Sequence, residues 1–235
     1  MIICIFALNN EIMASIINDP IARLMGLRYK SHPWHGLDVG EGAPDVVTAF
    51  IEMVPTDTVK YEVDKTSGYL KIDRPQKFSN VVPALYGFLP QTYCGDSVGK
   101  LCCDRLQRQD INGDKDPLDI VVLTERSIAH GDIIAEVRPI GGLRMIDGNE
   151  ADDKIIAVLK NDATYSVYTD ISELPTVVVD RLRHYFLTYK DMPGVERLAE
   201  IPEVYGREDA HDVINASLDD YKQHFNSLEA ILRNV

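Results

Sequence analysis

Short runs of apolar residues, separated by turn-forming residues, fill the middle of the chain and predict β-strands. Residues 64–68, Asp-Lys-Thr-Ser-Gly, are typical of a hairpin connection. No helical pattern alternates with these runs, so we expect an antiparallel barrel or sandwich. The expected strands cover residues 47–54, 59–63, 69–72, 120–123, 133–137, 142–146 and 155–159.

Apolar residues at helical spacing predict two helices near the end of the chain. The first begins near Pro175 and reaches Tyr189, and the second extends from about Glu208 to Leu232. Neither segment is long or apolar enough to span a membrane.

The start of the chain differs from the strand pattern. A short amphipathic pattern over residues 12–28 predicts a helix, and Pro and Gly interrupt any regular element from there to Pro44. We therefore expect residues 1–45 to be an N-terminal extension or arm, and residues 46–235 to form one domain that includes the late helices.

Acidic residues outnumber basic ones by 37 to 24, which gives a net charge of -13. Such a charge repels nucleic acid and anionic membranes, so we expect neither as a partner. A polyanionic substrate would need bound cations to enter. The four cysteines show no CxxC spacing and no dense disulfide framework, which favours the cytoplasm.

The densest acidic cluster is Asp114, Asp116 and Asp119, directly before the apolar run 120–123. Carboxylates this close repel one another unless a hard cation neutralises them. A second acidic cluster lies in residues 147–154, between two expected strands. Two such turns at one barrel mouth would suit Mg²⁺, and Mg²⁺ suits phosphate chemistry.

Each cluster alone also fits a solvated acidic turn. An EF-hand that starts at Asp110 is excluded, because Lys115 stands at its sixth position and Val121 at its twelfth. A phosphatase with an aspartyl nucleophile would place its acidic pair after a strand, whereas Asp114 precedes one.

The motifs in their order along the chain resemble the soluble family I inorganic pyrophosphatases of bacterial type. The resemblance covers residues 47–192. It implies an α+β, mainly β fold: a small closed antiparallel five-stranded OB-like barrel with flanking helices. The matching residues are Glu52, 60–64, Asp73-Arg74, Tyr86-Gly87-Phe88, Asp114-x-Asp116-Pro117-x-Asp119, Asp147, 152–154, 184–186 and 189–190.

The resemblance also implies residue roles. Several Mg²⁺ ions would be held most tightly by Asp114, Asp119 and Asp152, with Asp147, Glu52 and Glu62 serving other ions or their waters. The two phosphates of pyrophosphate would contact Lys60, Arg74, Tyr86, Lys154, Tyr189 and Lys190. Asp116 would act as the base for a metal-bound hydroxide that attacks directly, while Arg74, Tyr189 and Lys190 neutralise the departing phosphate.

The products would be two orthophosphates, and a homo-oligomer, either a dimer or a hexamer, is implied as well. Two rival readings differ in class. A nucleic-acid-binding barrel of the same topology would need a basic groove with stacking aromatics, which the net charge of -13 disfavours. A phosphohydrolase that acts on nucleotides is not excluded by the carboxylates alone.

The chain departs from the family pattern at three places. Val82 stands where many members have a tyrosine, and residues 95–112 are an insertion that we expect to be a rim loop carrying Cys102 and Cys103. Gly148 stands where many members have a glutamate. We expect water, rather than the nearby Glu150, to replace that carboxylate.

Overall fold

The computed structural model describes residues 30–76, 80–190 and 199–233, with side chains described as far as residue 225. The helix predicted over residues 12–28 lies outside these ranges. The chain divides into two compact units, Met1–His32 and Pro33–Val235, and the second contains all the elements described below.

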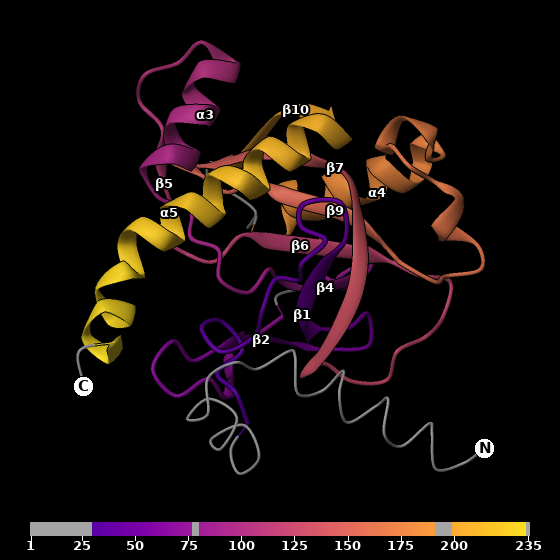
Figure 1. Ribbon diagram of the computed structural model, residues 1–235. Helices are drawn as coiled ribbons and strands as arrows, with labels where there is room; N and C mark the ends of the chain where they lie inside the picture. The colour runs from indigo at the N-terminus through magenta and orange to yellow at the C-terminus, as the bar shows by residue number, and fades with distance from the viewer. Residues whose placement is uncertain (1–29, 77–79, 191–198, 234–235) are drawn as a thin grey trace, which may run out of the picture. The chain divides into compact units, whose positions relative to one another are not determined.

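Five strands pair edge to edge in a closed ring, in the order β1, β4, β6, β9, β7 and back to β1 (Figure 1). This ring confirms the predicted five-stranded OB-like barrel. Four of its pairs are antiparallel, but β6 and β9 are parallel, which corrects the wholly antiparallel expectation. The reason is topological. β7 is antiparallel to both β1 and β9, and β4 is antiparallel to both β1 and β6, so β6 and β9 both run in the direction of β1. The strands are β1 (Val47–Met53), β4 (Leu85–Phe88), β6 (Asp119–Leu123), β7 (Ile133–Asp147) and β9 (Lys154–Leu159).

The central strands β6 and β9 are buried on both faces, which explains their continuous apolar sequences. Ile120 of β6 and Ile155 of β9 belong to one apolar cluster, whereas Val121 and Ile156 belong to another. Because successive side chains of a strand point to opposite faces, the ring separates two cores.

The strand β7 joins two of the predicted strands into one. Its pairing with β9 shifts between Pro139 and Gly141, so the strand bends there without ending. Three further strands extend the sheet beyond the ring: the short β5 (Asn112–Gly113) and β8 (Glu150–Ala151), and the longer β10 (Ala199–Gly206).

A separate hairpin is formed by β2 (Val59–Val63) and β3 (Leu70–Pro75). Its connection is the predicted one: the Asp64 carboxylate accepts from the Ser67 backbone N–H at 2.8 Å, and Gly68 has a φ of 73°. The positive φ explains glycine at this position.

The helices α4 (Thr176–Thr188) and α5 (Arg207–Arg233) confirm the two predicted ones. The rim loop expected for residues 95–112 is wrong, because most of it is the helix α3 (Asp96–Leu106), followed by β5. Only Val98, Gly99 and Cys102 of α3 are buried, so its sequence carries little apolar periodicity. Short 3₁₀ turns cover Tyr165–Val167 and Ile171–Glu173. None of the helices in the described part of the chain has the length and apolar character needed to cross a membrane.

Candidate active site

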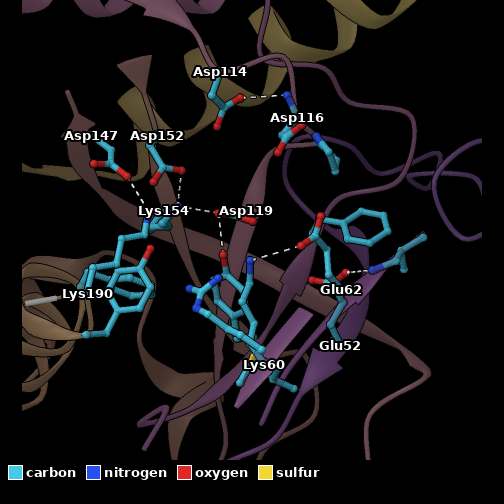
Figure 2. A pocket seen from close by; sticks show the side chains of 18 of the residues that line it. Glu52, Lys60, Glu62, Asp114, Asp116, Asp119, Asp147, Asp152, Lys154 and Lys190 are labelled. Carbon is cyan, nitrogen blue, oxygen red and sulfur yellow. Dashed lines mark hydrogen bonds and ion pairs between the residues drawn. The ribbon is translucent and has the colours of Figure 1, made fainter. Parts of the chain in front are cut away.

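A pocket of about 250 Å³ opens between the ring, the β2–β3 hairpin and the end of α4 (Figure 2). All the residues that the sequence named for the site line this pocket. They are Glu52, Lys60, Glu62, Arg74, Tyr86, Asp114, Asp116, Asp119, Asp147, Asp152, Lys154, Tyr189 and Lys190.

Several of these side chains lie at the ends of strands. Asp119 begins β6 and Lys154 begins β9, and the parallel register pairs the two residues directly. Asp147 ends β7, one strand farther along the sheet. Ends of neighbouring strands lie at one rim of a barrel, so residues distant in sequence meet there.

The loop that carries Asp114 and Asp116 is held by backbone hydrogen bonds. The Lys115 N–H donates to the Cys94 carbonyl at 2.9 Å, and the Cys94 N–H donates to the Asp116 carbonyl at 2.8 Å. Within the loop, the Asp116 N–H donates to the Asp114 carboxylate at 2.9 Å. The carboxylate of Asp116 takes no part in this framework.

Lysine ammonium groups lie between the carboxylates. Lys154, which is only 2% exposed, donates to Asp119 at 2.5 Å and also to Asp152. Lys190 pairs with Asp147 in the same way (Figure 2). Tyr86 donates its hydroxyl to Asp119 at 2.6 Å. The pocket therefore alternates negative and positive groups.

The cationic residues of the hairpin form a second part of the pocket. Lys60 lies 3.5 Å from both Glu62 and Asp73, and Arg74 also pairs with Asp73. Lys60 and Glu62 meet because they are two residues apart in β2, and alternate residues of a strand lie on one face.

Burial perturbs the acidic groups. Burial raises the pKa of Glu52 to about 8, although the Val63 N–H donates to its carboxylate at 2.7 Å. The pKa of Asp114 is raised by burial and by the charges of Asp152 and Asp119. Burial is also the main cause of the raised pKa of Asp152. Buried carboxylates that resist ionisation gain most from a hard cation, and Mg²⁺ prefers oxygen ligands, so these residues fit the ion.

The carboxylates do not form a closed ligand set in the structure. Across residues 30–76, 80–190 and 199–233, no group of three or more His, Cys, Asp or Glu side chains is arranged to hold a metal ion. The ammonium of Lys154 separates Asp119 from Asp152 instead. The assignment of individual ligands therefore stays a prediction.

The raised pKa of Glu52 predicts the pH dependence of the metal-free protein. Its pKa is about 8 when folded and 4.5 in its unperturbed state, so between these values the folded state binds more protons. Stability should therefore rise as the pH falls from about 8 to about 5, by at most about 1.4 kcal/mol per pH unit for each such group. Urea unfolding in EDTA at pH 8 and pH 6 measures the difference.

The control for this prediction is Glu52→Gln, which should flatten part of the slope. Asp162 and Asp170 have lowered pKa values, so their contributions are lost only below the unperturbed value of 3.8, outside this window. Stability that rises with pH from 5 to 8 would contradict the prediction.

The structure gives the surroundings of two residues that depart from the family pattern, Val82 and Gly148. Val82 is 1% exposed and packs in the core outside the pocket. Gly148 has a φ of 66° in the turn between β7 and β8, where a side chain would meet open space. The positive φ gives a conformational reason for glycine at this position.

Sequence reasoning assigned no role to several lining residues. Lys65 pairs with Asp116 from the hairpin connection, and Trp34 donates its indole N–H to the Thr92 carbonyl at 2.7 Å. Neither has a sequence signal, because both reach the pocket through tertiary contacts. The other lining residues without a chemical role predicted from the sequence are Met53, Val63, Gln76, Phe88, Pro117, Tyr185 and Phe186. Glu150, to which we preferred water as the replacement for the missing carboxylate, lines the pocket as well.

Comparison with known proteins gives the family. The family model described as inorganic pyrophosphatase matches residues 49–222. The chain belongs to the inorganic pyrophosphatase family. The resemblance drawn from the motifs is confirmed, and this pyrophosphatase is a hydrolase.

Relatives of this pyrophosphatase occur in bacteria and plants. An inorganic pyrophosphatase of Chlamydia caviae is 50% identical over 83% of this chain and 92% of that protein. Soluble inorganic pyrophosphatase 1 of Arabidopsis thaliana is 34% identical over 92% of this chain and 89% of that protein. The crystal structure of the inorganic pyrophosphatase from Thermus thermophilus matches with a TM-score of 0.68 and 30% identity, over 82% of this chain and 99% of that one.

Proposed function

We propose that this chain hydrolyses pyrophosphate to two orthophosphates with several Mg²⁺ ions. The observation that carries the proposal is the pocket itself. Six carboxylates predicted to bind metal and six groups predicted to bind phosphate, together with Asp116, line one hollow. A site that holds both a polyanion and cations needs this mixture.

The proposed metal ligands are Asp114, Asp119 and Asp152 for the tightest ions, with Asp147, Glu52 and Glu62 for further ions or their waters. Bound Mg²⁺ would neutralise phosphate charge and lower the pKa of the attacking water. Because Lys154 lies 2.5 Å from Asp119, we expect this lysine to turn toward a phosphate when an ion replaces it at the carboxylates.

The proposed substrate contacts are Lys60, Arg74, Tyr86, Lys154, Tyr189 and Lys190. Lys190 lies over the Tyr189 ring, 5.3 Å from its centroid, at the end of α4. With Arg74 on the facing hairpin, these two residues would take up the charge of the departing phosphate.

Asp116 is the proposed general base. Its side chain is 48% exposed, so water reaches its carboxylate. A carboxylate positioned beside the attacking water can accept its proton during attack on phosphorus, without a protein nucleophile.

Turnover of pyrophosphate and of ATP, measured side by side with Mg²⁺, tests the proposal. We expect rapid release of phosphate from pyrophosphate and little from ATP. Equal or faster turnover of ATP would favour the rival nucleotide phosphohydrolase. Replacement of Mg²⁺ by Ca²⁺ should abolish most turnover, because Ca²⁺ has a longer and looser coordination.

Glu150 gives a sharper test of the metal assignment. The antiparallel register pairs it with Asp147, and it lines the pocket. Directly opposed residues have neighbouring side chains on one face, so the structure supports Glu150 over water as the replacement for the missing carboxylate. We expect Glu150→Gln to raise the Mg²⁺ concentration for half-maximal activity about 10-fold.

The matched control is Glu136→Gln, at an exposed glutamate paired with Lys160 away from the pocket. A Mg²⁺ titration of both variants decides between the ligands. An unchanged titration in Glu150→Gln would show that water completes the site.

Cellular location and assembly are also proposed. Cys94, Cys102 and Cys103 form no disulfide, which supports the cytoplasm. We expect the protein to self-associate as a dimer or a hexamer, and light scattering on the purified protein measures which of the two it forms.

A further inference from the structure

A buried aspartate of α5 caps the helix α3. Asp220 is 5% exposed, and its carboxylate accepts three backbone N–H groups. They are those of Gly95 at 2.9 Å, Ser97 at 3.0 Å and Val98 at 3.0 Å. A negative charge at a helix N-terminus is stabilising, and each of these donors would otherwise lack a partner within the helix.

The segment that Asp220 holds lies directly behind the acidic loop. Two hydrogen bonds join Cys94 to Lys115 and Asp116, at 2.9 and 2.8 Å. Nearby, the Leu118 N–H donates to the Thr92 hydroxyl at 2.9 Å. Gly95, which donates to Asp220, directly follows Cys94, which bonds to the acidic loop. The cap and the acidic loop therefore share one backbone segment.

No space separates the segment from the loop. A Cβ atom at Gly113, next to Asp114, would lie 2.1 Å from the Cys94 carbonyl oxygen and 2.4 Å from that of Gly95. A Cβ at Gly99 of α3 would lie 2.8 Å from the Gly113 N atom. Backbone atoms in such contact cannot shift independently, so a displacement at Gly95 must reach the loop.

We propose that Asp220 is a positioning residue for Asp114 and Asp116. It is not among the residues that line the pocket. Its carboxylate fixes residues 95–98, and these fix the loop that presents both aspartates to the pocket. The helix α3 is thereby a support for the active site, held by α5. The kinetic part of this inference rests on the proposed function.

Asp220→Ala removes all three hydrogen bonds, whereas Asp220→Asn keeps one amide oxygen able to serve Gly95 and Val98, which share Oδ2. Asp219→Asn is the matched control, since Asp219 is exposed and pairs only with Lys222 among the contacts described for it, at 3.3 Å. Hydrogen exchange by mass spectrometry compares the four proteins without substrate.

We expect faster exchange in Asp220→Ala not only in α3 but also at Lys115 and Leu118, whose N–H groups bond to the supported segment. Asp220→Asn should lie between Asp220→Ala and the wild type, and the peptides of the β2–β3 hairpin should not change. Faster exchange confined to α3 would reduce Asp220 to a structural cap and overturn the proposal.

Kinetics supply the second readout. At saturating Mg²⁺, kcat of Asp220→Ala should fall about 10-fold and its Mg²⁺ requirement should rise, while KM for pyrophosphate changes little because Lys60 and Arg74 lie on the separate hairpin. Wild-type kinetics in all Asp220 variants would also overturn the proposal. Absence of turnover in the wild type and in Asp219→Asn would instead refute the proposed function, and the exchange data would still test the support.

Discussion

Asp116→Asn is expected to fold normally and to bind Mg²⁺, but to lose at least about 100-fold in kcat, the scale of a lost general base. The amide keeps the shape of the side chain and removes the acceptor for the proton. The loop should keep its conformation, because Asp116 is tied to Cys94 and Asp114 only through its backbone carbonyl and N–H. Because the Asp116 side chain is 48% exposed, the substitution leaves no cavity in the core.

Steady-state kinetics at neutral pH, with thermal unfolding and Mg²⁺ calorimetry, measure the three expectations. Asp104→Asn is the control, since this exposed aspartate of α3 lies outside the pocket. Near-normal kcat in Asp116→Asn would reject the role of base. A loss of Mg²⁺ binding would reassign Asp116 as a ligand.

The sequence predicted the strands whose residues form one uninterrupted apolar run. The runs 120–123 and 155–159 are apolar throughout because β6 and β9 are buried on both faces, so their identity did not depend on context. The strand β10 was missed because only Ile201 and Tyr205 are buried in it, its pairing is irregular between Glu200 and Glu203, and it contains Pro202. The helix α3 was missed because it buries only Val98, Gly99 and Cys102, and because Asp220, whose carboxylate caps it, is distant in sequence.

The residues of the active site could be predicted from the sequence for a different reason. An ordered set of motifs points to one pocket without any knowledge of distances, and the structure brings its members together. Ion pairs such as Lys65 with Asp116 carry no such pattern. The buried pair of Arg144 and Asp153 is a second example, because the sequence shows only an arginine in a strand and an aspartate beside Asp152.

Arg144 of β7 is fully buried, with 0% exposure. Its guanidinium donates to Glu203 at 2.7 Å, lies 3.8 Å from Asp153 and stacks 4.5 Å from the centroid of the Tyr205 ring. Asp153 is 2% exposed, and burial raises its pKa to about 6 although Arg144 opposes this shift. Because Asp152 and Lys154 flank Asp153, this pair lies behind the active-site rim.

Arg144→Met is expected to destabilise the protein by about 3–5 kcal/mol at pH 8, because it leaves the carboxylate of Asp153 buried without its cation. Without Arg144, the pKa of Asp153 would rise further. Asp153 would then become protonated as the pH falls from 8 to 6, and the buried charge would disappear. The loss of stability in Arg144→Met should therefore shrink over this range. Urea unfolding at both pH values measures the effect, with Arg126→Met as the control at a side chain 77% exposed.

The double variant Arg144→Met with Asp153→Asn separates loss of the charge pair from loss of packing. Replacement of both partners removes the unpaired charge, so the double variant should recover most of the stability lost in the single one. If the double variant were as unstable as Arg144→Met at both pH values, the arginine would act through its packing against Tyr205 and its bond to Glu203.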